Sequence, residues 1–537
     1  MIASKDTCRR VPGKHRPLLM IVLAALALSN TITQVLAAAG DLDPTFGNGG
    51  KVTTDLGSGF DEINSVVVQQ DGKIVAGGDL LLFPEFDDVA FALARYNPNG
   101  SLDQSFGDGG KVITNFSFSP DEIGALAIQS DGKIVAVGAA NHGLGLIRYN
   151  SNGSLDVTFG SGGKVLTAIN IPILGLAAAI QSDGKILVSS SIGIETPSGS
   201  AFLLLRYNSD GSLDSGFGSG GVVTTRFETN SSDHSFALAI EPSGRIVVGG
   251  STFNGVRSAF ALALYESSGA LVPTFGSAGK VITVTEGFSS GILTLALQSD
   301  GGIQAAGAAG DGIGIHTAYT RYDLNGILDP NFGTAGMVAA DSLPANDTFI
   351  RRMAILADGH IVAAGNTRQF PSDFLAARYN PNGNFDGSFG TGGKTKIDFN
   401  GGNDGVGGLA IQVDGKIVIG GGALASAGFD FALVRLEGGP GFDICIQDES
   451  NGNLLKINTT TGDYLFTNCG GLTIGGIGSI TQRGGLITLQ DNRPDRRLLA
   501  RIDTVARKAT ATLQMLSVGA TFTLTDMNTA NDTCVCR

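Results

Sequence analysis

The stretch Leu102–Val112 reads LDQSFGDGGKV and is one of seven copies of the same element. Its Phe-Gly-x-x-Gly signature recurs every 53 to 60 residues, with the phenylalanine at Phe46, Phe106, Phe159, Phe217, Phe275, Phe332 and Phe389. A fixed period of this length is typical of an array of similar units, none of which can bury its hydrophobic surface alone. The repeat is therefore the feature that decides the fold.

Two further signatures recur in the same order. One, of the Asp-Gly-Lys-Ile type, begins at Asp71, Asp131, Asp183, Asp300, Asp358 and Asp414. The other, of the Arg-Tyr-Asn type, begins at Arg95, Arg148, Arg206, Arg321, Arg378 and Arg435. The fourth copy departs from both, because Ser243 and Leu264 take the places of the aspartate and the arginine, and Val272 replaces the aspartate of the Leu-Asp element. We interpret the repeated arginine as the ion-pair partner of that aspartate.

Each copy contains four strand-like runs. In the second copy they are Ala125–Gln129, Lys133–Gly138, Gly145–Asn150 and Ser154–Phe159, the last continuing toward Lys164–Leu166. The first two are short, aliphatic and separated by Ser-Asp-Gly, which predicts buried strands joined by a tight hairpin turn. Four-stranded antiparallel units repeated around an axis are the blades of a β-propeller.

The chain ends of the repeat region are complementary. The first repeat begins at Leu42–Phe46 as a fourth strand without the first three, and the last repeat stops after Phe431–Glu437 without a fourth strand. We therefore predict an all-β fold: a seven-bladed β-propeller over residues 40–438, in which the N-terminal strand closes the last blade.

The copies resemble the delta-60 repeat family of secreted and surface bacterial proteins. The resemblance rests on Leu102–Val112 and its six counterparts, and covers roughly residues 41–438. It implies a propeller-like repeat and an extracellular location, and it carries no activity.

The first 39 residues have the order of a secretory signal peptide. A basic stretch ends at Arg16, an apolar run covers Leu18–Leu28, and a small-residue site follows at Val35–Ala37 or Ala37–Ala39. The run is short for a bilayer span, with an uncleaved anchor as the alternative. We expect a secreted protein, extracellular or periplasmic, with no integral membrane segment after cleavage.

The chain is acidic. Losing residues 1–39 removes five basic residues and one acidic residue, which changes the formal net charge from −13 to −17. Such a charge repels nucleic acid, so nucleic acid is excluded as a partner, and a monomer that binds a protein or a glycan is expected.

The segment 439–537 holds every remaining cysteine. Cys445, Cys469, Cys534 and Cys536 in a short exported domain predict two disulfides, with zinc as the alternative. Runs that alternate apolar and polar residues, including Ser479–Leu489, predict a small disulfide-containing β barrel or sandwich.

Acidic residues suggest two places for a metal. Asn97–Asp103 is similar to the first half of a calcium loop, but its distal glutamate is missing and a tight turn needs the same residues, so we interpret it as a turn. The loops before the first strands would bring acids to the mouth of the central channel, where they could concentrate calcium or a basic ligand. The alternative is a solvated loop. These candidate ligands are Asp61, Glu62, Asp121, Glu122, Asp233, Asp347 and Asp404.

No nucleophile elbow, metal-spaced histidine pair or phosphate loop occurs, so no catalytic residue and no organic cofactor are predicted. The loops that vary between copies share one face of the predicted propeller, and variable loops on a rigid scaffold commonly carry binding. We predict an exported, non-enzymatic binding or scaffold protein for a protein or glycan ligand. The alternative is a metal-assisted lactonase or lyase acting in the channel.

Overall fold

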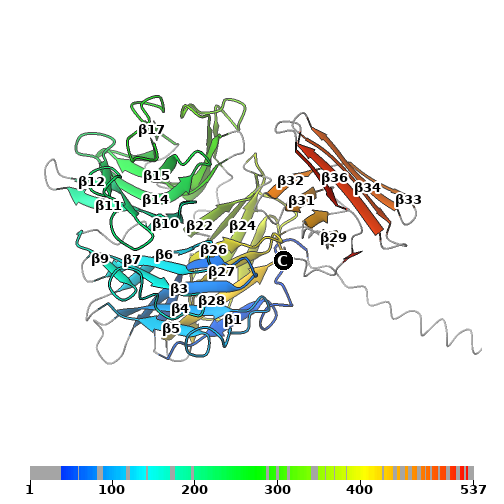
Figure 1. Cartoon of the computed structure of the whole chain (residues 1–537), viewed down its shortest axis with the longest axis horizontal. Helices are drawn as coiled ribbons and strands as arrows, with labels where there is room; N and C mark the ends of the chain where they lie inside the picture. Colours follow the sequence, from blue (N-terminus) through cyan, green and yellow to red (C-terminus); the bar gives the residue numbers. More distant parts are fainter. Residues whose placement is uncertain are drawn as a thin grey trace, which may run out of the picture. The chain divides into compact units, whose positions relative to one another are not determined.

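The computed structural model describes residues 38–438 apart from short gaps, and the backbone of ten strands between residues 444 and 529 (Figure 1). The gaps are residues 58–59, 82–88, 117–120, 141–142, 170–175, 195–198, 286–288, 298–300, 311–314, 340–348, 357–358, 368, 383 and 426–427. All named elements are β-strands. Among the described residues, no helix has the length and apolar character needed to cross a membrane.

Five four-stranded sheets form most of the repeat region. They are β2 (Asp61–Val68), β3 (Ile74–Leu81), β4 (Val89–Tyr96) and β5 (Lys111–Thr114); β6 (Glu122–Ile128), β7 (Ile134–Ala140), β8 (Gly143–Tyr149) and β9 (Lys164–Thr167); β18 (Ser289–Leu297), β19 (Ile303–Gly310), β20 (Ile315–Tyr322) and β21 (Met337–Ala339); β22 (Phe349–Ile355), β23 (Ile361–Asn366), β24 (Phe374–Tyr379) and β25 (Lys394–Ile397); and β26 (Asp404–Ile411), β27 (Ile417–Ala425) and β28 (Gly428–Leu436) with β1 (Lys51–Thr54).

The remaining strands of the repeats form one eight-stranded sheet. They are β10 (Ala177–Ile180), β11 (Ile186–Ile194), β12 (Gly199–Tyr207), β13 (Val222–Thr225), β14 (Ser232–Ile240), β15 (Ile246–Phe253), β16 (Ser258–Tyr265) and β17 (Lys280–Thr283). The predicted count of seven blades is therefore wrong: the structure has five separate four-stranded blades. The eight-stranded sheet is continuous because β12 pairs in parallel with β14 through Ser200 and Ser232. This pairing lies outside the repeated signatures, so their spacing gave no sign of it.

The fourth strand lies farther along each repeat than predicted. Ser154–Phe159 consists of turns and a single bridge from Leu155 to Tyr149, and the strand itself is β9. The Phe-Gly-x-x-Gly loop explains why the fourth strand begins later in the sequence than predicted. The N–H of Gly163 donates to the carbonyl of Phe159 at 2.8 Å, and Gly163 has φ +94, so the chain cannot extend before Lys164.

The two ends of the repeat region pair with each other, as the incomplete first and last repeats predicted. Strand β1, blue in Figure 1, pairs antiparallel with the yellow β28, from Lys51 opposite Val434 to Thr54 opposite Phe431. Ala39, which the sequence placed in the signal peptide, is buried in the same core as Val434. The unit that contains the repeats begins at Ala38.

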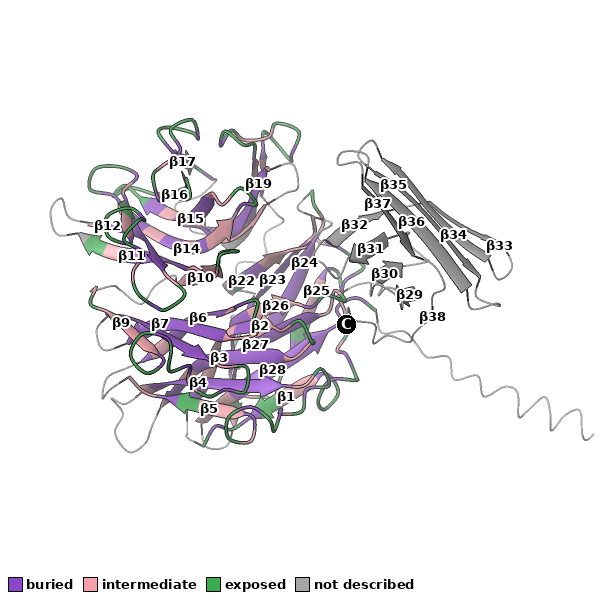
Figure 2. Cartoon of the chain, viewed as in Figure 1, coloured by how far each residue is buried: buried purple, intermediate pink, exposed green. Residues whose placement is uncertain are grey.

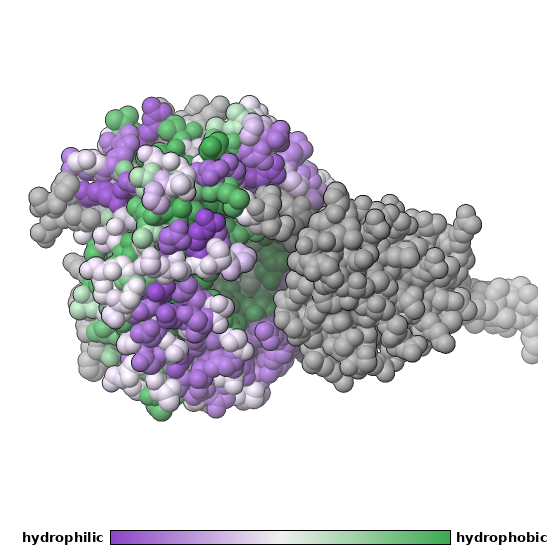
Figure 3. Space-filling view, turned by 45° about the horizontal axis from the view of Figure 1, so that its top comes forward, coloured by the Kyte–Doolittle hydropathy of each residue, from purple (hydrophilic) through white to green (hydrophobic). Residues whose placement is uncertain are grey.

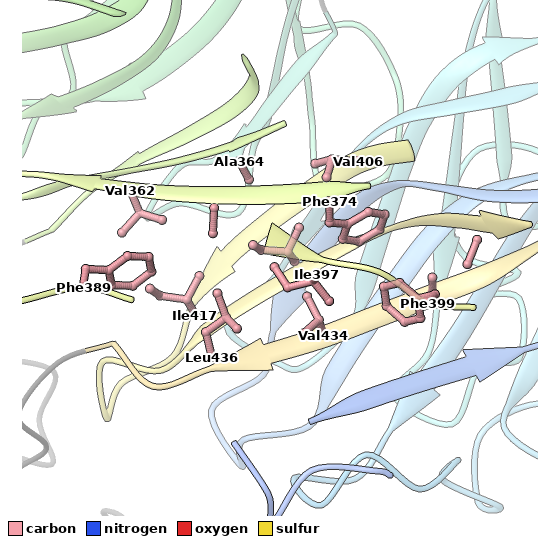
Figure 4. Packing of buried hydrophobic residues seen from close by; sticks show 14 of the residues in the cluster. Val362, Ala364, Phe374, Phe389, Ile397, Phe399, Val406, Ile417, Val434 and Leu436 are labelled. Atoms are coloured by element: carbon pink, nitrogen blue, oxygen red, sulfur yellow. The ribbon is translucent and has the colours of Figure 1, made fainter. Parts of the chain in front are cut away.

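Hydrophobic side chains pack between successive sheets. Between the sheets β22–β25 and β26–β28, Phe374, Ile397 and Phe399 pack with Val406 and Val434 (Figure 4). Comparable clusters join the other neighbouring sheets, and one of them joins the last sheet to the first. A further cluster packs the two halves of the eight-stranded sheet, β10–β13 and β14–β17, together. The second and third strands are the most buried (Figure 2). Since both faces of these strands are covered, they are nearly continuous apolar runs.

A glycine in the second strand accommodates a bulge in the first. The register shifts by one residue in β2, β6, β14, β18, β22 and β26. In the first sheet, a Cβ on Gly78 would lie 1.8 Å from the carbonyl oxygen of Glu62, which excludes any side chain. Gly138, Gly250, Gly307 and Gly421 meet a carbonyl in the same way. Ser190 takes this place opposite β10, whose described pairing has no bulge.

The C-terminal segment forms two antiparallel five-stranded sheets. One contains β29 (Ile444–Gln447), β30 (Leu454–Ile457), β31 (Asp463–Thr467), β32 (Thr473–Ile477) and β38 (Asn528–Thr529); the other contains β33 (Ser479–Arg483), β34 (Leu486–Arg493), β35 (Arg496–Asp503), β36 (Lys508–Met515) and β37 (Ala520–Leu524). The predicted run Ser479–Leu489 is thus split between two strands. No disulfide is found in the described part of the chain. The side chains of Cys445, Cys469, Cys534 and Cys536 lie outside it, so the predicted disulfides gain no support.

Candidate functional site

The repeated arginine and aspartate form an ion pair, as the sequence predicted. Nε of Arg95 donates to Oδ2 of Asp103 at 2.8 Å, and both side chains are less than 10% exposed. Lys73 contacts the same oxygen at 3.0 Å, and the Arg95 guanidinium lies 4.5 Å from the ring centre of Phe106. All three signatures meet here, at what we call the repeat ion pair. The others are Arg148–Asp156, Arg206–Asp214, Arg321–Asp329, Arg378–Asp386 and Arg435–Asp43.

The repeat ion pair also joins one repeat to the next. Nη1 of Arg95 donates to the carbonyl of Ser151 in the following repeat. Burial raises the pKa of Asp103, but hydrogen bonds from Ser105 and Lys73 and the charge of Arg95 outweigh burial and hold this pKa well below its ordinary value of 3.8. The most regular charged residues therefore serve the fold and are not free to bind a ligand.

The calcium-like sequence at Asn97–Asp103 forms a turn. Oδ1 of Asn99 accepts the main-chain N–H of Ser101 at 3.0 Å and its hydroxyl at 2.8 Å. Nδ2 of Asn97 donates to the same hydroxyl oxygen at 3.0 Å. These groups hydrogen-bond to one another within the turn, which supports the turn interpretation.

The fourth copy replaces the repeat ion pair with apolar packing. Leu264 and Val272 are buried together with Phe275 in one hydrophobic cluster. Arg245, from the altered turn, instead pairs with Glu241, with Nε 2.7 Å from Oε2. Replacing both partners together should preserve stability, because a buried ion pair can be exchanged for packed hydrophobic residues of similar volume at little cost in folding free energy.

Four of the predicted channel-mouth aspartates close the loops between successive units. Asp61, Asp121, Asp233 and Asp404 are at most 2% exposed. In each, Oδ2 accepts a main-chain N–H from five or six residues earlier, at 2.7 to 2.9 Å; the donors are Leu56, Phe116, Phe227 and Phe399. This shared bond explains why an aspartate recurs at this place. Asp347 lies outside the described residues.

Glu62 and Glu122 lie near a third carboxylate that the sequence analysis did not single out. Asp79 accepts hydrogen bonds from Nδ2 of Asn64 at 2.8 Å and from the N–H of Ile123 at 3.1 Å. Burial raises the pKa of Asp79 well above its ordinary value, and the charges of Glu122 and Glu62 raise it further. Burial raises the pKa of both glutamates as well. The sequence did contain a sign of this residue: Asp79 is an acid near the end of β3, at a position where the other copies have alanine, serine, asparagine or glycine.

Arg352 of β22 reaches this carboxylate group across β26. Its Nη2 donates to the carbonyl of Asn64 at 3.2 Å. At this place β26 lies close against β2, since a Cβ on Gly407 would lie 1.8 Å from the carbonyl oxygen of Ile63. A guanidinium and three carboxylates thus gather on strands of three different sheets.

Two of the predicted acids belong to groups of three carboxylates at equivalent places. Asp404 lies with Asp373 and Asp398, and Asp61 lies with Asp55 and Asp430; in each group one oxygen from every residue lies within 4.8 Å of the others. Asp404 and Asp61 begin first strands, and Asp398 and Asp55 follow fourth strands. Asp373 directly precedes the third strand β24, and Asp430 lies near the start of the third strand β28. Sequence reasoning found only the first-strand member, because the third-strand member comes from another segment of the chain, which the fold brings beside it.

The two carboxylate groups have different surroundings. Nζ of Lys396 lies 2.5 Å from Oδ2 of Asp373, whereas Thr53 occupies the corresponding register position beside the other group. Next to Asp61 and Asp430, the rings of Phe60 and Phe429 lie 5.1 Å apart.

Part of this aromatic pair is exposed. Phe60 is 49% exposed and adjoining Leu424 is 37% exposed. The face seen in Figure 3 is largely hydrophilic, with hydrophobic patches between.

Comparison with known families supports a β-propeller repeat. The family model described as "Domain of unknown function (DUF5122) beta-propeller" matches residues 69–106, 129–159, 181–217, 241–275, 356–389 and 412–438. No curated protein matches the chain. The resemblance to the delta-60 family remains a prediction.

Solved structures with a similar fold are distant in sequence. Virginiamycin B lyase from Staphylococcus aureus is 11% identical, with a TM-score of 0.41, and the match covers 72% of this chain and 98% of that one. Drosophila Semaphorin 2a is 10% identical, with a TM-score of 0.45 and coverage of 74% and 76%. The polysaccharide lyase Uly1 is 11% identical, with a TM-score of 0.42 and coverage of 76% and 94%. What the comparisons show is that six segments of this chain match a β-propeller family of unknown function.

Proposed function

We propose that this chain is an exported, non-enzymatic binding protein that recognises its ligand through non-repeating residues around Asp430. The observation that carries the proposal is the Phe60–Phe429 pair beside the carboxylates of Asp55, Asp61 and Asp430. At the equivalent places beside the other carboxylate group, Asn403 corresponds to Phe60 and Ser372 corresponds to Phe429. There the side-chain oxygen of Asn403 accepts the main-chain N–H of Ser372 at 3.0 Å. The aromatic pair is therefore not a requirement of the fold.

The chemistry of this patch favours a basic protein segment as the ligand. Carboxylates attract an ammonium or guanidinium group, and an aromatic ring contacts the same cation through its face. Leu424 adds apolar surface for the aliphatic part of a lysine or arginine side chain. The formal charge of −17 without the first 39 residues would also speed the encounter with a basic partner.

The test is binding of the full chain to an array of lysine- and arginine-rich peptides, with a neutral glycan array alongside. We expect peptide binding that falls about tenfold or more in the Phe60→Ala/Phe429→Ala variant, as for interface anchors. Asp430→Asn should also weaken binding, and this loss should be larger at lower salt. Val256→Ala, an exposed position elsewhere, is the matched control. Binding only to glycans, or binding that the double variant leaves unchanged, would refute the basic-ligand proposal.

A second candidate is acid–base chemistry at Asp79. The observation that favours it is the raised pKa of Asp79 between Glu62 and Glu122, with Arg352 close by, since perturbed titrating groups cluster at functional sites. Lactones and uronate polysaccharides are the probes. Turnover by the full chain that is lost in Asp79→Asn but kept in Asp71→Asn would establish it, and no turnover with either probe would count against it.

A further inference from the structure

The group Asp373, Asp398 and Asp404 has features of a cation site, and these features do not depend on the proposed function. Asp373 directly precedes β24, the third strand of one sheet, Asp398 follows β25, and Asp404 begins β26 of the next sheet. One oxygen from each lies within 4.8 Å of the other two. Asp373 and Asp404 are each 2% exposed, whereas Asp398 is exposed. The group is thus buried on one side and open on the other.

An unpartnered buried oxygen distinguishes this group from a solvated acidic surface. Oδ2 of Asp404 accepts the N–H of Phe399 at 2.9 Å, but Oδ1 is buried and has no hydrogen-bond partner. Leaving a buried carboxylate oxygen unsatisfied is unfavourable, and natural proteins rarely do so without a ligand or an ion. The position of Asp404 therefore favours a positive group beside Oδ1.

The lysines near the group satisfy only part of its charge. Lys396 pairs with Asp373, and its side chain is 56% exposed, so it can leave at little cost. Lys51 donates to the main-chain oxygen of Asp398 at 2.6 Å. In the described part of the chain, neither lysine forms an ion pair with Asp404.

The geometry points to a divalent-cation site at Asp373, Asp398 and Asp404, which takes calcium and in which Lys396 substitutes for the ion when calcium is absent. Calcium binds carboxylate oxygens at about 2.3–2.6 Å, so two of its ligands lie at most about 5 Å apart, which matches the spacing here. Calcium takes six to eight oxygens. The positions on the open side beside Asp398 would go to water or to oxygen atoms of a bound partner.

The second carboxylate group supplies an internal comparison. Asp55, Asp61 and Asp430 have Thr53 where this group has Lys396. If the lysine amine competes with the ion, Lys396→Thr should strengthen calcium binding about two- to fivefold, the scale of an exposed ion pair. A lysine introduced by Thr53→Lys should leave calcium binding at Asp404 unchanged.

Calorimetric titration of calcium chloride into the full chain tests the proposal, with Asp430→Asn as background to remove the second group. We expect saturable binding of one calcium, weakened about tenfold or more by Asp404→Asn. Asparagine can still accept the Phe399 N–H, so the loop should fold; Asp398→Asn serves as a second, exposed variant. Asp183→Asn, an exposed aspartate paired with Lys185, is the control for charge alone.

A thermal shift on adding millimolar calcium, present in the background variant and absent in Asp404→Asn, would agree with the titration. The proposal is overturned if the background variant binds no calcium at millimolar concentration. It is also overturned if Asp404→Asn and Asp398→Asn, both folded by circular dichroism, bind calcium as the background does.

Discussion

Arg435 and Asp43 stand 392 residues apart in the sequence and form an ion pair, with Nε 2.6 Å from Oδ2. In the other copies the same pair joins residues only eight apart, as in Arg95 and Asp103. The chain ends thus reproduce an interaction that every regular repeat makes locally. Lys416 completes the arrangement at 2.8 Å from Asp43, as Lys73 does for Asp103.

The repeat ion pair should be replaceable as a unit but not in halves. Arg95→Leu alone should lower the free energy of unfolding by about 3 kcal/mol, because Asp103 would remain buried with weaker compensation. The double variant Arg95→Leu/Asp103→Val copies the fourth copy and should lie within about 1 kcal/mol of the parent chain. Denaturant unfolding measures both. A double variant as unstable as the single one would show that Leu264 and Val272 depend on other changes in their repeat.

The parent chain and the Arg95→Leu/Asp103→Val variant should differ in how their stability responds to acid. Because the folded-state pKa of Asp103 lies below its ordinary value, the ion pair stabilises the fold fully above that value and loses its effect as the pH falls. Between about pH 5 and pH 2, the parent chain should therefore lose on the order of 2 kcal/mol relative to the double variant. Unfolding measured at several pH values tests this. An unchanged difference across that range would mean that Asp103 does not titrate with folding.

Glycine in the second strands should tolerate no side chain. Gly78→Ala would place a Cβ 1.8 Å from the carbonyl oxygen of Glu62, so we expect a loss of about 3 kcal/mol. Gly193 provides the control, since a Cβ there would meet nothing within 4 Å; Gly193→Ala should change stability by less than about 0.5 kcal/mol. Equal melting temperatures for the two variants would contradict the close approach.

The predicted signal peptide should be cleaved after Ala37 and not after Ala39. Ala39 is buried, its carbonyl accepts the N–H of Gly390 at 2.7 Å, and the N–H of Gly40 donates to the carbonyl of Glu437 at 2.6 Å. Cleavage after Ala39 would remove the first of these bonds. The mass of the exported protein should therefore correspond to a chain that starts at Ala38; a start at Gly40 would contradict this.

Removal of residues 38–54 should cause self-association. Without β1, the edge of β28 would present unpaired N–H and C=O groups from Phe431 to Val434, and Arg435 would lose Asp43. An open, apolar strand edge recruits other strands. Light scattering after size exclusion should find a monomer for the full repeat region and higher species for the truncated one. A stable truncated monomer would show that β1 is dispensable.

The local pattern was sufficient for most of the strands and for the repeat ion pair. Asp-Gly and Asn-Gly turns, aliphatic runs and the charge pairing of Arg95 with Asp103 all depend on residues close in sequence. The fourth strand was misplaced because the Phe-Gly-x-x-Gly loop, which holds Gly163 at positive φ, also reads as a continuation of an extended run.

The sequence by itself determined the repeat, its all-β character and the pairing of the chain ends, because these follow from short-range propensity and from what the first and last copies lack. Only the tertiary structure decided which sheets are separate, since the bridge from Ser200 to Ser232 involves no repeated residue. It also decided which acids can act together. Asp373 and Asp404 are adjacent because two sheets meet there, and a contact between different sheets leaves no local pattern in the sequence.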